Sequence, residues 1–131
     1  MIVMNVLEQC GVHFTEVSSE LTVQKWTVKE NMTQINGILH GGLSAAIAEQ
    51  GAGMGAVQLI PEGYAAVGTS LESHHLKAVP MGSQCETRAM PETVGGKLQV
   101  WRVEQCILPT EELFNVSTVT IYIKKMTYDD K

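Results

Sequence analysis

The chain has 131 residues, a formal net charge of -5 and a calculated pI of about 5.3. Its 44% apolar and 18% charged residues are the balance of one globular domain, here residues 1–131, and not of a disordered segment. The Lys and Arg residues are scattered, so we expect no binding to nucleic acid. No apolar run is long enough to span a bilayer, so we expect no membrane binding. The cysteines are widely spaced, which predicts reduced thiols and a cytoplasmic protein.

A short helix and a β-hairpin are predicted first. Residues Ile2 to Gln9 carry apolar side chains at helical spacing, and Gly11 is a natural helix end. From Val12 to Val28 the residues are β-branched or alternate in polarity around a turn at Ser18–Glu20, which predicts a hairpin. The polar residues Asn31–Asn36 are then expected to form a loop.

One long helix follows this loop. The segment from Leu43 to Val57 is rich in Ala and contains no Pro. At 100° per residue one face of this helix should meet a sheet; it comprises Leu43, Ile47 and Met54. The opposite face, which we expect to pack against a partner, comprises Ala45, Glu49, Ala52 and Ala56, with Gly53 beside them.

The remaining chain is predicted to be β-structure. Four strands are expected, at Ala65–Leu76, Gln84–Met90, Lys97–Leu108 and Leu113–Lys125. The last three are joined by short loops at 91–96 and 109–112, which predicts an antiparallel meander. Because such a sheet needs one face covered, we predict an α+β fold in which a curved antiparallel sheet wraps around the long helix.

The long helix carries an unusual start and one unusual carboxylate. Gly41 and Gly42 leave the first-turn N–H groups open at the positive end of the helix dipole, where they can bind an oxyanion. Glu49 is the only charged residue between Gly41 and Leu59. A carboxylate among small residues is costly unless it is paired or has a role. An ordinary solvated Glu is the alternative, but a surface helix usually carries several charges.

The motif around this helix resembles a known family. Gln34, the run Gly37–Gly42 and the pair Ala48–Glu49 resemble the signature of hotdog acyl-CoA thioesterases. The similarity is closest to the branch with Glu on the helix, the hydroxybenzoyl-CoA and dihydroxynaphthoyl-CoA thioesterases; phenylacetate-pathway thioesterases have Asp there. It continues through 73–78, 82 and 95–101, so it covers roughly residues 30–124. The resemblance implies the hotdog fold and hydrolysis of an acyl- or aroyl-CoA thioester.

The resemblance also implies a role for each motif residue. Glu49 would attack the thioester carbonyl or activate a water for that attack, and both routes remain open. The Gly41 N–H would polarise the carbonyl oxygen. Gln34 would hold the carboxylate or the water, and His40 would position the helix entrance and the thioester. In this family the site lies between two subunits, which implies a homodimer, and pairs of dimers would form a homotetramer.

Further residues are expected to contact the substrate. Gly53 stands where related enzymes usually carry Ser or Thr, so either the water is held otherwise or the hydrolytic rate is low. Gly53 would also enlarge the acyl pocket. Coenzyme A carries phosphates, so cations are expected near the mouth of the pocket. The expected substrate contacts are Gly42, Gly53, Met54, His75, Lys77 and Lys97.

Other functions are less consistent with the sequence. No metal-ligand spacing, dinucleotide fingerprint or P-loop occurs, so no cofactor is expected beyond the coenzyme A of the substrate. His40 as the base of a hotdog dehydratase would need a following Pro-Gly, which is missing. The remaining alternative is a binding module that senses acyl-CoA without hydrolysing it, favoured by Gly53 and disfavoured by Glu49 and Gln34.

Overall fold

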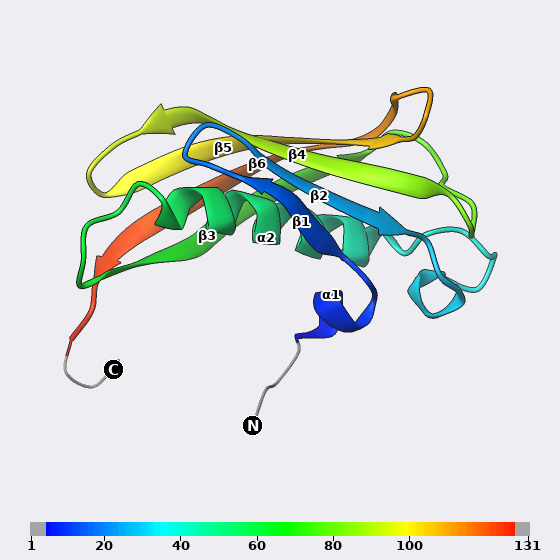
Figure 1. The fold of residues 1–131 in the computed structure, drawn as a ribbon, viewed down its shortest axis with the longest axis horizontal. Coiled ribbons are helices and arrows are strands. Elements are labelled where there is room, and N and C mark those ends of the chain that lie inside the picture. Colours follow the sequence, from blue (N-terminus) through cyan, green and yellow to red (C-terminus); the bar gives the residue numbers. More distant parts are fainter. Residues whose placement is uncertain (1–4, 128–131) are drawn as a thin grey trace.

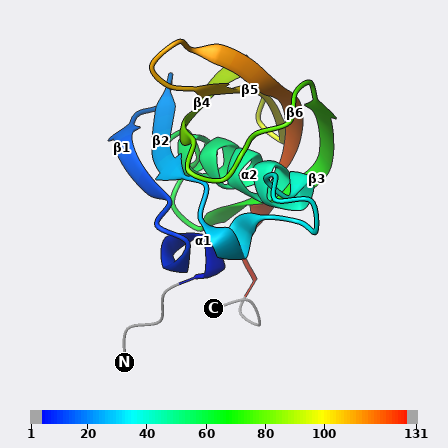
Figure 2. The same ribbon diagram turned by 90° about the vertical axis from the view of Figure 1, so that its right-hand side faces the viewer.

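The structure is a computed structural model that describes residues 5–127. Its helices and strands, in chain order, are α1 (Val6–Gln9), β1 (His13–Val17), β2 (Thr22–Thr27), the 3-10 helix η1 (Glu30–Met32), α2 (Gly41–Val57), β3 (Tyr64–His75), β4 (Gln84–Val94), β5 (Leu98–Ile107) and β6 (Glu112–Lys125). The strands form one antiparallel sheet in the order β1-β2-β4-β5-β6-β3. This sheet curls around α2 (Figures 1 and 2), which confirms the predicted hotdog fold.

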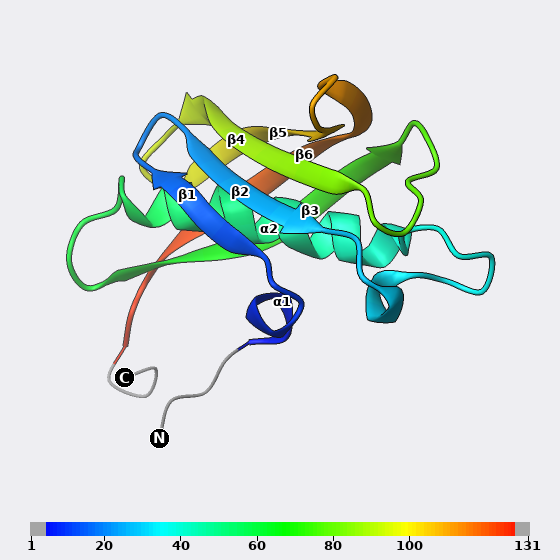
Figure 3. The same cartoon turned by 45° about the vertical axis from the view of Figure 1, so that its right-hand side comes forward.

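The predicted N-terminal elements form with small shifts. Asn5 caps α1 by accepting from the Glu8 N–H at 2.9 Å. Gly11 ends the helical turn with a φ of +85°, a conformation that favours glycine. The β1–β2 hairpin then lies beside β4, with α1 beneath it (Figure 3). The first residues of the predicted helix, 2–4, lie outside the described residues.

Strand β4 is longer than predicted. We expected it to end at Met90, with Pro91 opening a loop, but it runs on to Val94. Pro91 is tolerated because β2 pairs with β4 only as far as Ala89, so no strand on that side needs a proline N–H. The pairing with β5 shifts register between Pro91 and Thr93, which places the proline at a bulge.

The two faces of α2 were predicted only in part: Ile47 faces the sheet and Glu49 lies on the opposite side, as expected. Its sheet-facing side consists of Ser44, Ile47, Ala48, Gly51, Ala52, Gly55 and Ala56. Ala52 and Ala56, which we expected on the opposite side, are fully buried, whereas Met54 is only half-buried. Small residues face the sheet because the strand side chains are large: a Cβ at Gly55 would lie 2.3 Å from the Trp101 ring.

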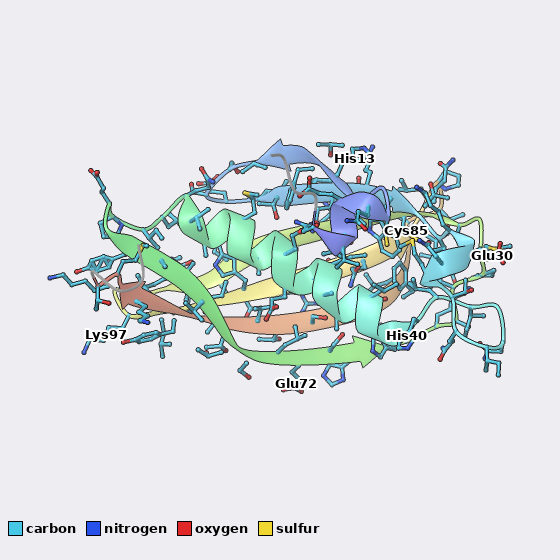
Figure 4. The ribbon with its side chains drawn as sticks, turned by 90° about the horizontal axis from the view of Figure 1, so that it is seen from below. His13, Glu30, His40, Glu72, Cys85 and Lys97 are labelled. Atoms are coloured by element: carbon cyan, nitrogen blue, oxygen red, sulfur yellow. The ribbon has the colours of Figure 1, made fainter. Side chains whose placement is uncertain are left out.

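The side of α2 opposite the sheet is left open within the described chain. Seen from below, α2 lies between β3 on one side and the α1–β1 segment on the other (Figure 4). Glu49 is exposed on this side, and Gly53 is half-buried. No helix among residues 5–127 has the length and apolarity to cross a bilayer.

Candidate active site

The first turn of α2 has one unpaired N–H group. His40 is the N-cap, and its Nδ1 accepts a hydrogen bond from the Gly42 N–H at 3.1 Å. The Leu43 N–H donates to the carbonyl oxygen of His40 at 3.0 Å. Among residues 5–127 the Gly41 N–H has no hydrogen-bond acceptor, so it is the first-turn group that is free to bind an oxyanion.

A cavity of about 580 Å³ opens at this helix end. We call it the donor cavity, because Gly41, which has the unpaired N–H, is part of its lining. It brings together six of the residues predicted from the sequence: Gln34, His40, Gly41, Gly42, His75 and Lys77. The Lys77 ammonium also forms an ion pair with the Glu112 carboxylate, and both side chains are about half exposed.

His75 packs directly on the helix start. A Cβ at Gly41 would lie 2.9 Å from Nε2 of His75, so a residue larger than glycine would push this imidazole away. The closeness of the ring to the Gly41 backbone places a second polar nitrogen next to the unpaired N–H. The neighbouring His74 instead pairs with Glu72 at 3.0 Å.

Glu49 lines a separate cavity of about 420 Å³, which we call the carboxylate cavity. Its walls include the small residues Ala46, Gly53, Ala66 and Gly68. Within the described part of the chain, the Glu49 carboxylate has no hydrogen bond or ion pair. It is therefore available to a ligand or to a second protein chain.

Sequence reasoning missed Gly68, which makes room for this carboxylate. A Cβ at Gly68 would lie 2.7 Å from Oε2 of Glu49, so only glycine permits the observed approach of Glu49 to β3. The pairing of β3 with β6 shifts register between Gly68 and Ser70. A glycine inside a strand pattern signals such a bulge or close approach, and this signal was present in the sequence.

The two cavities do not form one site within a single chain. Gly41 and Glu49 are eight residues apart on α2, which at ~1.5 Å per residue separates them by about 12 Å. A reacting carbonyl must lie within ~3–3.5 Å of the attacking atom. Lys97 is also distant, because it lies at the opposite end of the molecule from His40 (Figure 4).

Two substrate contacts predicted from the sequence lie near Glu49. Gly53 lines the carboxylate cavity, and a Cβ there would meet no atom within 4 Å, so the space of a missing hydroxyl group is open. Met54 lines a neighbouring pocket formed with α1 and β1, and the two pockets share Asn5 and Gln50. The Asn5 and Gln50 side chains are 3.4 Å apart and form a polar wall between them.

Comparison with known proteins identifies the family of this chain. The family model described as the thioesterase superfamily matches residues 36–112, which include the helix start, Glu49 and His75. The chain belongs to the thioesterase superfamily. It is a thioester hydrolase by family, and its fold is that of the hotdog thioesterases.

Three proteins illustrate the similarity. A 1,4-dihydroxy-2-naphthoyl-CoA hydrolase from Listeria monocytogenes is 31% identical over 93% of this chain and 98% of its own. A proofreading thioesterase, EntH, from Cronobacter turicensis is 31% identical over 75% of this chain and 71% of its own. The crystal structure of a thioesterase from Haemophilus influenzae superposes with a TM-score of 0.86 at 25% identity, over 95% and 86% of the two chains.

Proposed function

We propose that this protein hydrolyses acyl- or aroyl-CoA thioesters to the free acid and coenzyme A, with Glu49 of one copy and the Gly41 N–H of a second copy at each site. One observation carries this proposal: α2 bears an unpaired carboxylate, Glu49, and an unpaired N–H group, that of Gly41, which line two separate cavities. The two residues are about 12 Å apart along the helix axis. Hydrolysis of a thioester needs both groups at one carbonyl.

The chemistry follows from these two groups. The Glu49 carboxylate either attacks the carbonyl carbon itself, giving an anhydride that water then hydrolyses, or removes a proton from the attacking water. In both routes the carbonyl oxygen gains negative charge as the tetrahedral intermediate forms, and the Gly41 N–H donates to it. The C–S bond then breaks. In the water route the coenzyme A sulfur takes the proton that Glu49 removed from the water, and in the direct route it leaves as a thiolate and takes up the proton released when water hydrolyses the anhydride. Glu49 has no competing partner among the described residues, which leaves it free for either role.

The spacing on α2 also suggests how two copies combine. In an antiparallel pair of helices related by a twofold axis through Ala45, Gly41 of each helix stands opposite Glu49 of the other, because Ala45 is midway between them. Residues 41, 45 and 49 are four apart and lie on one stripe of the helix. Ala45 is small and only half-buried in the single chain, which permits close approach.

The acyl group is proposed from the relatives and from the space at Gly53. Relatives named 1,4-dihydroxy-2-naphthoyl-CoA hydrolase and thioesterase support an aroyl-CoA substrate. The open space at Gly53 beside Glu49 leaves room for a bulky acyl group. The homotetramer and the cytoplasmic location remain predictions from the sequence.

The experiment is thiol release from a panel of short and long aliphatic, benzoyl, phenylacetyl and hydroxynaphthoyl coenzyme A thioesters. Wild type and Glu49→Ala are measured side by side. We expect release by wild type alone. The protein's own thiols should not interfere, because Cys10, Cys85 and Cys106 are buried and burial raises the pKa of Cys85 to about 12.

Two results would contradict the proposal. Equal release by wild type and Glu49→Ala would show that another group performs the reaction. Saturable binding of the thioesters without any thiol release would instead favour the acyl-CoA sensor, for which the missing hydroxyl at Gly53 is the main support.

A further inference from the structure

A buried chain of hydrogen bonds crosses the sheet beneath the donor cavity. The Trp26 indole N–H donates to the Thr87 hydroxyl at 2.9 Å, and that hydroxyl donates to Oε1 of Gln105 at 2.8 Å. Nε2 of Gln105 donates to the Ser44 carbonyl oxygen at 3.0 Å. These four residues are at most 3% exposed, so water does not compete for their hydrogen bonds.

The direction of this chain is fixed at both ends. An indole nitrogen can only donate, so the Thr87 oxygen accepts from Trp26 and its single proton goes to Gln105. A backbone carbonyl can only accept, so the Ser44 oxygen independently requires the NH₂ end of Gln105. Both anchors therefore give Gln105 the same orientation, which is otherwise hard to assign for an amide.

This orientation determines the next link, Asn115. Nε2 of Gln105 donates to Oδ1 of Asn115 at 3.1 Å, so the Asn115 NH₂ group points the other way. It donates to Oγ of Ser73 at 2.9 Å and to Nδ1 of His75 at 3.0 Å. The Ser117 hydroxyl donates to Oδ1 of Asn115 at 2.8 Å, which makes that oxygen a double acceptor.

The sheet register holds these partners together. His75 on β3 stands directly opposite Asn115 on β6, and Ser73 stands opposite Ser117. Asn115 is fully buried and Ser117 is 1% exposed. A buried donor or acceptor without its partner is costly, so the orientation of Asn115 that satisfies all of these hydrogen bonds is strongly favoured.

The consequence for His75 is a defined tautomer. Because Nδ1 accepts from Asn115, the proton of the neutral imidazole lies on Nε2. Nε2 is the nitrogen next to Gly41, and a Cβ there would lie 2.9 Å from it. The donor cavity then holds an imidazole N–H beside the unpaired Gly41 N–H, and not a basic nitrogen.

We propose that the relay Trp26–Thr87–Gln105–Asn115 holds His75 as an Nε2–H donor to the substrate at the start of α2. Asn115 is the positioning residue, and it acts through His75. The donor role toward substrate rests on the proposed thioester hydrolysis, whereas the tautomer does not. His75 would thus share with Gly41 the stabilisation of the carbonyl oxygen as it gains charge.

The tautomer can be measured without any substrate. Long-range ¹⁵N–¹H correlation spectra distinguish a protonated imidazole nitrogen from an unprotonated one, at a pH where the same spectra show a neutral ring. Wild type should show His75 protonated on Nε2 alone. A wild-type spectrum with the proton on Nδ1 would overturn the proposal, and this outcome needs no variant that must fold.

Asn115→Asp tests the cause. It replaces the NH₂ donor by a carboxylate oxygen, which accepts, so His75 should become protonated on Nδ1. A folded Asn115→Asp protein that keeps an unprotonated Nδ1 would show that Asn115 does not set the tautomer. Asn31→Asp is the matched control, because Asn31 is exposed and is not a member of the relay, and it should leave the His75 spectrum unchanged.

Turnover separates the two proposals. With an active substrate, Asn115→Asp should lower kcat by ~10²-fold, as loss of one oxyanion donor does, with a much smaller change in KM. An Asn115→Asp enzyme with switched tautomer and unchanged kcat would refute the donor role of His75. If wild type hydrolyses no thioester but shows the Nε2–H tautomer, the proposed function fails and the relay stands.

Discussion

The two cavities along α2 differ in what they offer to a ligand. The donor cavity at the helix start has an unpaired Gly41 N–H and two imidazoles whose Nδ1 atoms are both acceptors, in His40 and His75. The carboxylate cavity has one unpaired acceptor, Glu49, among small residues. Donors stabilise a developing oxyanion, and a carboxylate attacks or activates water.

This difference is the basis of our proposal that each cavity is half of a reaction site. Hydrogen bonds within the chain fix the groups around the donor cavity, since His40 caps the helix and His75 is bound to Asn115. Among the described residues Glu49 has no hydrogen bond or ion pair, and its carboxylate lies close to Gly68. The unpaired groups of the two cavities are complementary, and in the proposed dimer a second copy of the chain supplies the missing half.

The largest effect is expected from the carboxylate cavity. Glu49→Gln keeps the shape of the side chain but removes the negative charge and the proton-accepting oxygen. We expect kcat to fall by ~10²–10⁴-fold or below detection, with an unchanged melting temperature. Steady-state thiol release and thermal unfolding measured on the same preparation check this. Retention of more than a tenth of the wild-type kcat would remove Glu49 from the chemistry.

The role of the donor cavity can be tested by removing the backbone N–H of Gly41. Gly41 is the first residue of α2, where proline is tolerated, and Gly41→Pro removes the N–H. Gly41→Ala is the matched control, because it adds a Cβ against His75 but keeps the N–H. We expect Gly41→Pro to have a kcat ~10²–10³-fold below that of Gly41→Ala. Equal rates for the two variants would exclude the Gly41 N–H as the oxyanion donor.

Gly53 and Gly55 of α2 have different surroundings: Gly53 lines the carboxylate cavity, and Gly55 packs against the core. Gly55→Ala drives a Cβ into the Trp101 ring, which should lower the free energy of unfolding by ~1–3 kcal/mol. Gly53→Ala points into open space and should raise it by ~0.5–1 kcal/mol, as expected for Gly to Ala in a helix. Denaturant unfolding of both variants checks the opposite signs, and a destabilised Gly53→Ala protein would contradict the open space at that position.

The smallest effect is expected from the cations. Lys77 lines the donor cavity but is already paired with Glu112, and Lys97 lies at the opposite end of the molecule from His40. Lys77→Ala should raise KM several-fold with little change in kcat, because an exposed ion pair contributes at most ~1 kcal/mol. Lys97→Ala is the matched control. If Lys97→Ala raised KM more than Lys77→Ala, coenzyme A would bind elsewhere, or Lys97 of a second copy would contact it.

Much of the fold could be predicted from the sequence, because the hairpin and the meander have clear alternation and turn residues. The two faces of α2 could be predicted only in part. Nearly all of its residues are small or apolar, so the pattern has no preferred side, and the large Trp101 ring on β5 decides which glycines and alanines face inward. We predicted that β4 ends too early, because a proline usually interrupts a strand. Only the structure shows that β2 does not extend alongside β4 as far as Pro91.

The site was predicted in part for a similar reason. The residues around Gly41 and Glu49 lie in one continuous motif, and the sequence alone singled them out. Gly68 and Asn115 lie on strands far along the chain, and only the folded sheet brings them to Glu49 and His75. Their partners depend on how β3 and β6 pair, and these two strands are not joined by a hairpin turn that would fix their register.

The central claim is that Glu49 and Gly41 act across two copies, and mixing two inactive variants tests it most directly. Glu49→Ala and Gly41→Pro chains with different tags are refolded together, and the mixed dimer is purified. In that dimer one site combines both defects and the other combines none, so we predict about half of wild-type turnover per dimer. A purified mixed dimer as inactive as its two parents would contradict the account.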